Sequence, residues 1–160
     1  MKKEVSLTKI LFNFCLFLCV YYIGFTFIVA SFDKIVDPYE FSKNISAYEI
    51  TPYWINNFVA LILPWIELIC GILIFFGLIQ FFKYNSNFID VPNNLIIIML
   101  LWFIFILSIA SIRGLDIDCG CGLDEKTTPY DRLIEDIYLF IVTIIIKFRV
   151  RILDFLDKRY

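Results

Sequence analysis

The sequence predicts an all-α integral membrane protein, a four-helix bundle with a short amphipathic outer helix between its first and second spans. Two observations carry this prediction. Of the 160 residues, 61% are apolar and 18 are Phe, which is more apolar surface than one small soluble domain can bury. The charged residues gather at the edges of long uncharged stretches, and such edges mark membrane boundaries. We therefore expect residues 1–160 to form a single membrane domain in contact with the lipid bilayer.

The first span is predicted over residues 10–32, because no charged residue occurs between Lys9 and Asp33. At about 1.5 Å per helical residue, this run can cross a hydrocarbon core of about 30 Å. A cleaved signal peptide is the alternative. The run is longer than a usual signal core and lacks a small-x-small site before a polar mature sequence, so we favour a span.

The second and third spans are predicted over residues 54–82 and 93–112, and both are long enough to cross. The fourth, over residues 131–149, is weaker, because only the uncharged run 137–146 separates Asp136 from Lys147. It must use the snorkelling stem of Lys147 to reach across the membrane. Three spans plus a surface helix therefore remain the alternative.

Apolar residues in the segment between the first two spans predict the amphipathic outer helix. Phe41, Ile45 and Tyr48 follow the spacing i, i+4, i+7, which places them on one helical face. Such a helix lies on the bilayer surface or over the mouth of the bundle. Of the two, we favour simple surface anchoring.

The distribution of basic residues predicts the orientation, since cytoplasmic loops retain Lys and Arg. With the N-terminus inside, the inner side holds Lys2, Lys3, Lys9, Lys83, Lys147, Arg149, Arg151, Lys158 and Arg159. The outer side then holds only Lys34, Lys43, Arg113, Lys126 and Arg132. We expect a multi-pass protein of the cell inner (cytoplasmic) membrane with both termini cytoplasmic. Residues 33–53 and 113–131 then face the periplasmic or outer side, where disulfides persist.

The motif Cys119-Gly120-Cys121 lies in the second of these outer segments and is the main candidate for chemistry. Two thiols one residue apart close only a small ring, and departures from ordinary disulfide geometry make a bridge easier to reduce. Gly120 supplies the conformational freedom that such a tight turn needs. We expect one cysteine to attack or be attacked by a partner's sulfur and the other to resolve the mixed disulfide.

Charged residues near the motif leave the direction of the thiol pKa shift open. Arg113 could stabilise a thiolate, whereas Asp116 and Asp118 disfavour a nearby negative charge. Two alternatives to redox exchange remain: a structural or idle loop pair, and a zinc site formed by both sulfurs with the two aspartates. We favour exchange and assign no metal.

An ionisable residue near mid-bilayer, Glu67, indicates a polar site inside the bundle, because such a group is costly in lipid and usually has a partner. Pro64 frees a backbone carbonyl one turn earlier. The partners considered are Tyr21, Tyr22, Ser108 and Arg113. Lys34 ends the first span together with Asp33, and a pairing of this end with Arg113 or Asp118 is one hypothesis for its role.

Several function classes lose their usual residues. The chain contains no histidine, which removes His-dependent catalysis and metal binding. It also has no basic patch interleaved with aromatic residues, so we expect no nucleic-acid partner.

These residues together resemble the DoxX-like superfamily, and within it the MauE branch of redox-associated membrane proteins. The residues that carry the resemblance are Lys34, Phe41, Tyr48, Pro52, Pro64, Glu67, Leu68, Gly71 and Asp118-Cys119-Gly120-Cys121. The resemblance implies a four-helix membrane bundle whose paired cysteines face the periplasm. It also implies thiol-disulfide chemistry, or the assembly of exported cysteine-rich proteins, beside thioredoxin-like partners. The sequence departs from the family pattern at Gly122-Leu123 and at Glu135.

The leading hypothesis is a membrane thiol-disulfide exchange protein that acts on exported partner proteins through Cys119 and Cys121, supported by Arg113, Asp118, Gly120, Glu67 and Lys34. The rival is a non-enzymatic assembly factor or scaffold, and solute transport past Glu67 is a third interpretation. No cofactor is assigned. A quinone is kept only as an alternative, because no second outer cysteine pair exists, although Glu67 and Arg113 could line a small-molecule pocket.

Overall fold

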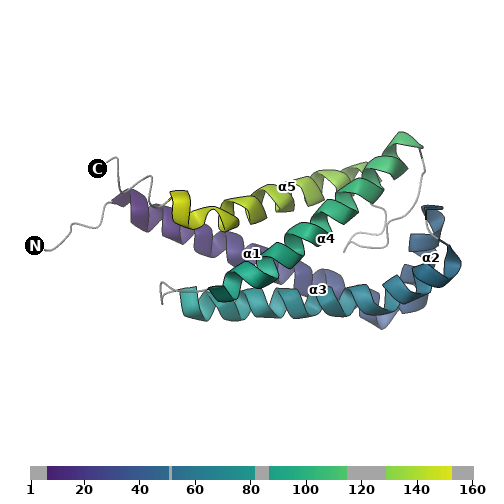
Figure 1. The fold of residues 1–160 in the computed structure, drawn as a ribbon, viewed down its shortest axis with the longest axis horizontal. Helices are drawn as coiled ribbons and strands as arrows, with labels where there is room; N and C mark the ends of the chain where they lie inside the picture. Colours follow the sequence, from purple (N-terminus) through teal and green to yellow (C-terminus); the bar gives the residue numbers. More distant parts are fainter. Residues whose placement is uncertain (1–6, 51, 82–86, 115–128, 153–160) are drawn as a thin grey trace, which may run out of the picture.

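The computed structural model describes residues 7–50, 52–81, 87–114 and 129–152, and all its regular elements are helices (Figure 1). The helices are α1 (Leu7–Val36), α2 (Pro38–Ala47), α3 (Tyr53–Phe81), α4 (Asn87–Ile112) and α5 (Pro129–Lys147). No strand occurs within these described ranges.

Four long helices lie side by side, and α1 packs mainly on α3 while α4 packs mainly on α5. The start of α1 and the end of α5 lie at one end of the bundle, and α2 lies at the other (Figure 1). We refer to these as the terminal end and the α2 end. The end of α4 and the start of α5 both lie toward the α2 end (Figure 1).

The chain turns between α1 and α2 at Asp37, directly before Pro38. A residue that precedes proline is disfavoured in the helical region, and Asp37 has φ −128° and ψ 79°. Its carboxylate accepts a hydrogen bond of 2.9 Å from the backbone N–H of Glu40, which caps the new helix. The sequence Asp-Pro therefore ends α1 and starts α2 within one residue.

Glycine lets α1 and α3 approach closely. A Cβ at Gly71 would lie 2.9 Å from Cγ1 of Ile28 and 3.1 Å from the carbonyl oxygen of Gly24. Contacts this short would force the helices apart, and small residues at such crossings are typical of helix pairs in membranes. This crossing fixes the register of α1 against α3.

The surface of the bundle is more apolar than the surface of a soluble protein. Large apolar side chains that are exposed on α3 include Trp54, Phe58, Leu61, Trp65, Ile69 and Phe76. Exposed apolar surface on this scale marks contact with another apolar phase. Three segments, Ile10–Val36, Trp54–Gly77 and Ile89–Ile112, are long and apolar enough to cross a bilayer. These helices fit a multi-pass membrane protein.

Helix α5 differs from the other long helices in its polarity. Its 19 residues span about 28 Å, and it packs along α4 and α1. It carries the charged residues Asp131, Arg132, Glu135, Asp136 and Lys147, and it is not among the segments with a span's hydropathy. A fourth membrane crossing, and hence a four-span bundle, stays a prediction.

Polar contacts join α4 to α5 near the terminal end. The guanidinium of Arg149, just beyond α5, donates to Asp90 Oδ1 at 2.6 Å. One turn away, Asn93 donates from Nδ2 to the carbonyl oxygen of Thr143 at 3.1 Å, and both side chains are buried. Hydrogen bonds between helices hold the pair together where apolar packing alone gives little orientation.

Candidate functional site

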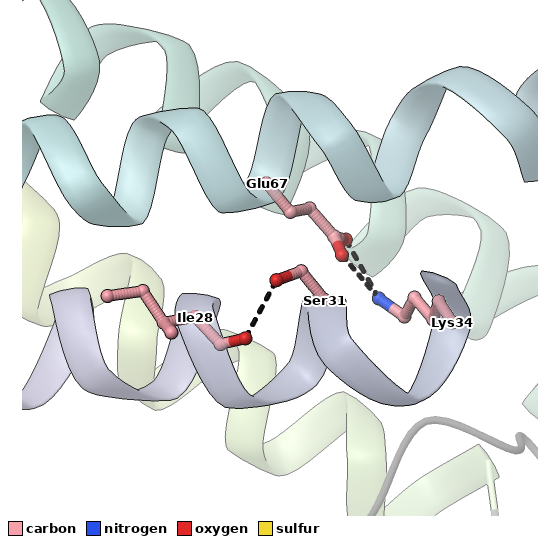
Figure 2. A network of polar contacts seen from close by, with 4 residues as sticks. All are labelled: Ile28, Ser31, Lys34 and Glu67. Atoms are coloured by element: carbon pink, nitrogen blue, oxygen red, sulfur yellow. Dashed lines mark hydrogen bonds and ion pairs between the residues drawn. The ribbon is translucent and has the colours of Figure 1, made fainter. Parts of the chain in front are cut away.

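A buried ion pair joins the middle of α3 to the end of α1. The ammonium of Lys34 lies 2.8 Å from both Oε1 and Oε2 of Glu67, and the side chains are 6% and 2% exposed. In Figure 2, Glu67 extends from α3 toward Lys34 in the last turn of α1. A charge buried in apolar surroundings is tolerated when it is paired in this way.

The neighbouring turns of both helices show how the backbone accommodates this pair. Pro64 lies one turn before Glu67 inside α3, where its ring leaves the carbonyl of Ala60 without the usual helical donor. On α1, Ser31 is buried and donates from Oγ to the carbonyl oxygen of Ile28 at 2.7 Å (Figure 2). The Ser31 hydroxyl therefore donates within its own helix, one turn before Lys34.

Two aromatic rings lie against the Lys34 ammonium. Its Nζ is 5.2 Å from the ring centroid of Phe41 in α2 and 5.6 Å from that of Phe103 in α4. Cation–π contacts of this kind contribute about 0.5 to 2 kcal/mol, more where the cation is desolvated. The lysine thus connects four helices through one ammonium group.

The ion pair forms part of the wall of a cavity of about 170 Å³ toward the α2 end, to which all five helices contribute. The polar side chains in the wall include Lys34, Asn44, Glu67, Arg132 and Asp136. The remainder is mostly aliphatic and aromatic, including Leu63 and Phe103. Two basic and two acidic groups leave these charges in balance.

Helix α2 covers this cavity. Phe41, Ile45 and Tyr48 all line it, so the apolar face of α2 is directed into the bundle and the preference for simple surface anchoring was wrong. The alternative position, over the mouth of the bundle, is the one observed.

Side-chain hydrogen bonds attach α2 to the start of α3. Ser42 donates to Asn57 Oδ1 at 2.5 Å, and Asn56 donates from Nδ2 to the hydroxyl of Ser46 at 2.9 Å. The short helix therefore has a polar attachment as well as an apolar one.

The structure corrects the expected partner of Glu67, which is Lys34 rather than one of the residues considered. Ser108 donates to the carbonyl of Ile104 at 2.6 Å. Arg113 is 45% exposed, donates to the carbonyl of Tyr48 at 3.2 Å and lies 4.0 Å from Glu49. Arg113 is also not among the residues that line the cavity, whereas Glu67 is.

The predicted redox motif lies outside the described residues. This applies to Cys119, Gly120 and Cys121, and to the neighbouring residues Asp116, Asp118 and Gly122. The alternative zinc ligands fall in the same segment. Among the residues that the structure does describe, no three His, Cys, Asp or Glu side chains gather to hold a metal ion.

Sequence reasoning missed several residues of the cavity wall, chiefly Arg132, Asp136, Asn44 and Phe103. Arg132 and Asp136 had a usable signal, because they are opposite charges four residues apart at the start of an apolar segment. Arg132 also forms an ion pair with Glu135. Asn44 and Phe103 gave no such signal, since an Asn in a polar segment and a Phe in a span are both ordinary.

The family model described as "Methylamine utilisation protein MauE" matches residues 12–149, a range that begins in α1 and ends just beyond α5. No curated protein and no solved structure matches the chain.

Proposed function

The chain belongs to the MauE family of membrane proteins, and from this premise we propose that it is a membrane-embedded thiol-disulfide exchange protein. Cys119 and Cys121 are the reacting residues. Its partner is an exported protein, either cysteine-rich or thioredoxin-like, whose disulfides it exchanges or helps to mature.

The observation that carries the proposal is the Cys-Gly-Cys sequence and its position in the chain. The motif lies in the sequence between the end of α4 and the start of α5, and these two helix ends both lie toward the α2 end of the bundle. We expect a small-ring disulfide between Cys119 and Cys121 to exchange more readily than an ordinary structural bridge.

The exchange requires no other reactant than the partner's two thiols. A partner thiolate attacks one sulfur of the Cys119–Cys121 disulfide, the internal S–S bond breaks, and the other cysteine leaves as a thiolate. The partner's second thiolate then attacks the mixed disulfide and releases the first cysteine. Two electrons pass from the partner to the chain, and the partner gains a disulfide. The reverse sequence reduces the partner by the same steps.

The proposal includes a topology. We place both termini in the cytoplasm of a cell with a periplasmic or outer face, and α5 as the fourth crossing of a DoxX-like bundle. The excess of basic residues on the terminal side supports this orientation. Reporter fusions after residues 50, 86 and 160 test this topology. The reporter used is active only on the periplasmic or outer side of the membrane, and its activity when fused after residue 160 would contradict the fourth crossing.

The exchange activity is tested by the redox potential of the pair. Cys15, Cys19 and Cys70, which form no disulfide in the described part of the chain, are replaced by alanine so that only Cys119 and Cys121 report. Thiol alkylation and mass spectrometry across a glutathione series then give the potential. We expect a reversible disulfide well above about −300 mV, the level below which structural bridges resist reduction.

The rival scaffold function is separated by single variants. Cys119→Ser or Cys121→Ser in this background should trap a mixed disulfide with the exported partner, and the double variant should trap none. A pair that stays locked, or a double variant that still matures the partner, would leave the non-enzymatic scaffold as the explanation.

A further inference from the structure

The cavity at the α2 end has the properties of a ligand site. Its volume of about 170 Å³ is similar to that of an engineered apolar cavity of about 150 Å³ that binds benzene. It thus has room for a compact ring compound. Its apolar wall would contact the body of such a ligand, as is usual for small-molecule sites.

One residue of the cavity wall also belongs to the exposed apolar surface of α4. Trp102 lines the cavity and is 51% exposed, and this residue belongs to the apolar segment Ile89–Ile112. The cavity wall and the lipid-facing surface of α4 therefore share a side chain. This shared side chain marks the side from which a ligand dissolved in the bilayer would approach the cavity.

The charges of the wall select against a charged ligand. Lys34 and Arg132 are balanced by Glu67 and Asp136, and Lys34 already forms an ion pair with Glu67 at 2.8 Å. An anion would meet two carboxylates and a cation would meet two basic groups. A charged ligand would lose its hydration in such a balanced site, and the wall has no excess of opposite charge to offset that free-energy cost.

The polar side chains favour a ligand that accepts hydrogen bonds. Lys34, Asn44 and Arg132 carry N–H donors at the wall. An oxygen on an otherwise apolar ring would bond them, as the few polar groups in ligand pockets usually do.

We propose that this cavity is a binding site for an uncharged, lipid-soluble ring compound with a hydrogen-bond-accepting oxygen, the chemical class that includes quinones. Lys34 and Glu67 form the polar side of the site, and Phe103 and Leu63 form part of its apolar side. The proposal concerns binding alone, and it stands apart from thiol exchange by Cys119 and Cys121.

Tryptophan fluorescence provides the test, because Trp102 lines the cavity while Trp54 and Trp65 do not. The variant Trp54→Phe/Trp65→Phe keeps Trp102 alone, and Trp54→Phe/Trp102→Phe keeps the exposed Trp65 as a lipid-facing control. Both carry Cys119→Ser and Cys121→Ser, so failure of thiol exchange does not affect the result. The proteins are placed in bilayer discs and titrated with tetramethyl-1,4-benzoquinone, whose fully substituted ring does not alkylate thiols.

We expect the quenching of Trp102 fluorescence to approach a limiting value as the quinone concentration rises. The quenching of Trp65 fluorescence should instead increase in proportion to the quinone concentration in the lipid. Adding Lys34→Met/Glu67→Met to the protein with Trp102 alone should raise the half-saturating concentration at least tenfold. Ala30→Leu, which fills the cavity from another part of its wall, should do the same without removing the ion pair. Tetramethylbenzoate, the anion of similar size, should not displace the quinone.

Proportional quenching of Trp102 would overturn the site. An unchanged half-saturating concentration in both Lys34→Met/Glu67→Met and Ala30→Leu would mean that the quinone binds elsewhere. That result would also overturn the proposed site. Displacement by tetramethylbenzoate at equal concentration would overturn the assignment of an uncharged ligand.

Discussion

Breaking the ion pair between Lys34 and Glu67 should destabilise the protein far more when one partner is removed than when both are removed. Glu67 is 2% exposed and Lys34 is 6% exposed, so either charge left alone would be buried without its partner. Removing one partner of a buried pair costs about 3 to 5 kcal/mol, whereas replacing both by apolar residues of similar size is often neutral or stabilising. We expect Glu67→Met and Lys34→Met each to fall in that range and Lys34→Met/Glu67→Met to lie within about 1 kcal/mol of the parent.

The assay is reversible unfolding in mixed micelles, followed by circular dichroism, for the parent, both single variants and the double variant. The difference between the double variant and the sum of the singles gives the coupling energy. Arg113→Met is the matched control, because Arg113 and Glu49 form a pair at 4.0 Å that is 45% and 72% exposed. Such surface pairs contribute at most about 1 kcal/mol. Single variants that each cost less than the control, or a double variant that costs their sum, would refute the reasoning.

Three further changes probe the packing around the site. Gly71→Ala should lower stability by about 1 to 3 kcal/mol, because the new Cβ would lie 2.9 Å from Ile28; an unchanged unfolding midpoint would argue against the close crossing. Asn93→Ala should cost about 1 kcal/mol through loss of the 3.1 Å bond to Thr143, and hydrogen exchange in α5 should rise with it. Phe103→Leu should cost about 0.5 to 2 kcal/mol in the parent, and a similar cost in a Lys34→Met protein would exclude the cation–π contact.

The helical character of the chain could be predicted because its long uncharged runs indicate segments in lipid. A backbone in lipid must satisfy its own hydrogen bonds, and a helix does so within one segment. The predicted segments 10–32 and 93–112 lie inside α1 and α4, and the predicted second span agrees with α3 up to Phe81. The end of α1 was placed too early. Asp33 and Lys34 suggested a membrane boundary, but the helix continues to Val36 until Pro38 ends it.

The ion pair could not be predicted, although both of its residues had been singled out. Charge and position identify Glu67 as a buried group that needs a partner, but the partner depends on how far α1 slides along α3. That register is fixed by the approach of Gly24 to Gly71, which periodicity within one helix does not reveal. The direction of α2 was missed for a related reason, because an amphipathic face looks the same whether it meets lipid or protein.

The pairing of Lys34 with Glu67 also has a consequence for biosynthesis. An isolated charge near the centre of a span opposes insertion by about 2.5 to 3.5 kcal/mol, and Glu67 lies in the middle of Trp54–Gly77. Lys34 precedes it in the chain, so α1 emerges from the ribosome first with its cation near the helix end, where a long side chain can reach water. The carboxylate of α3 then enters a membrane that already contains its counter-ion. The order of the two helices in the chain therefore suits insertion of α1 before α3, and a chain that lost α1 would have to integrate α3 with its charge unpaired.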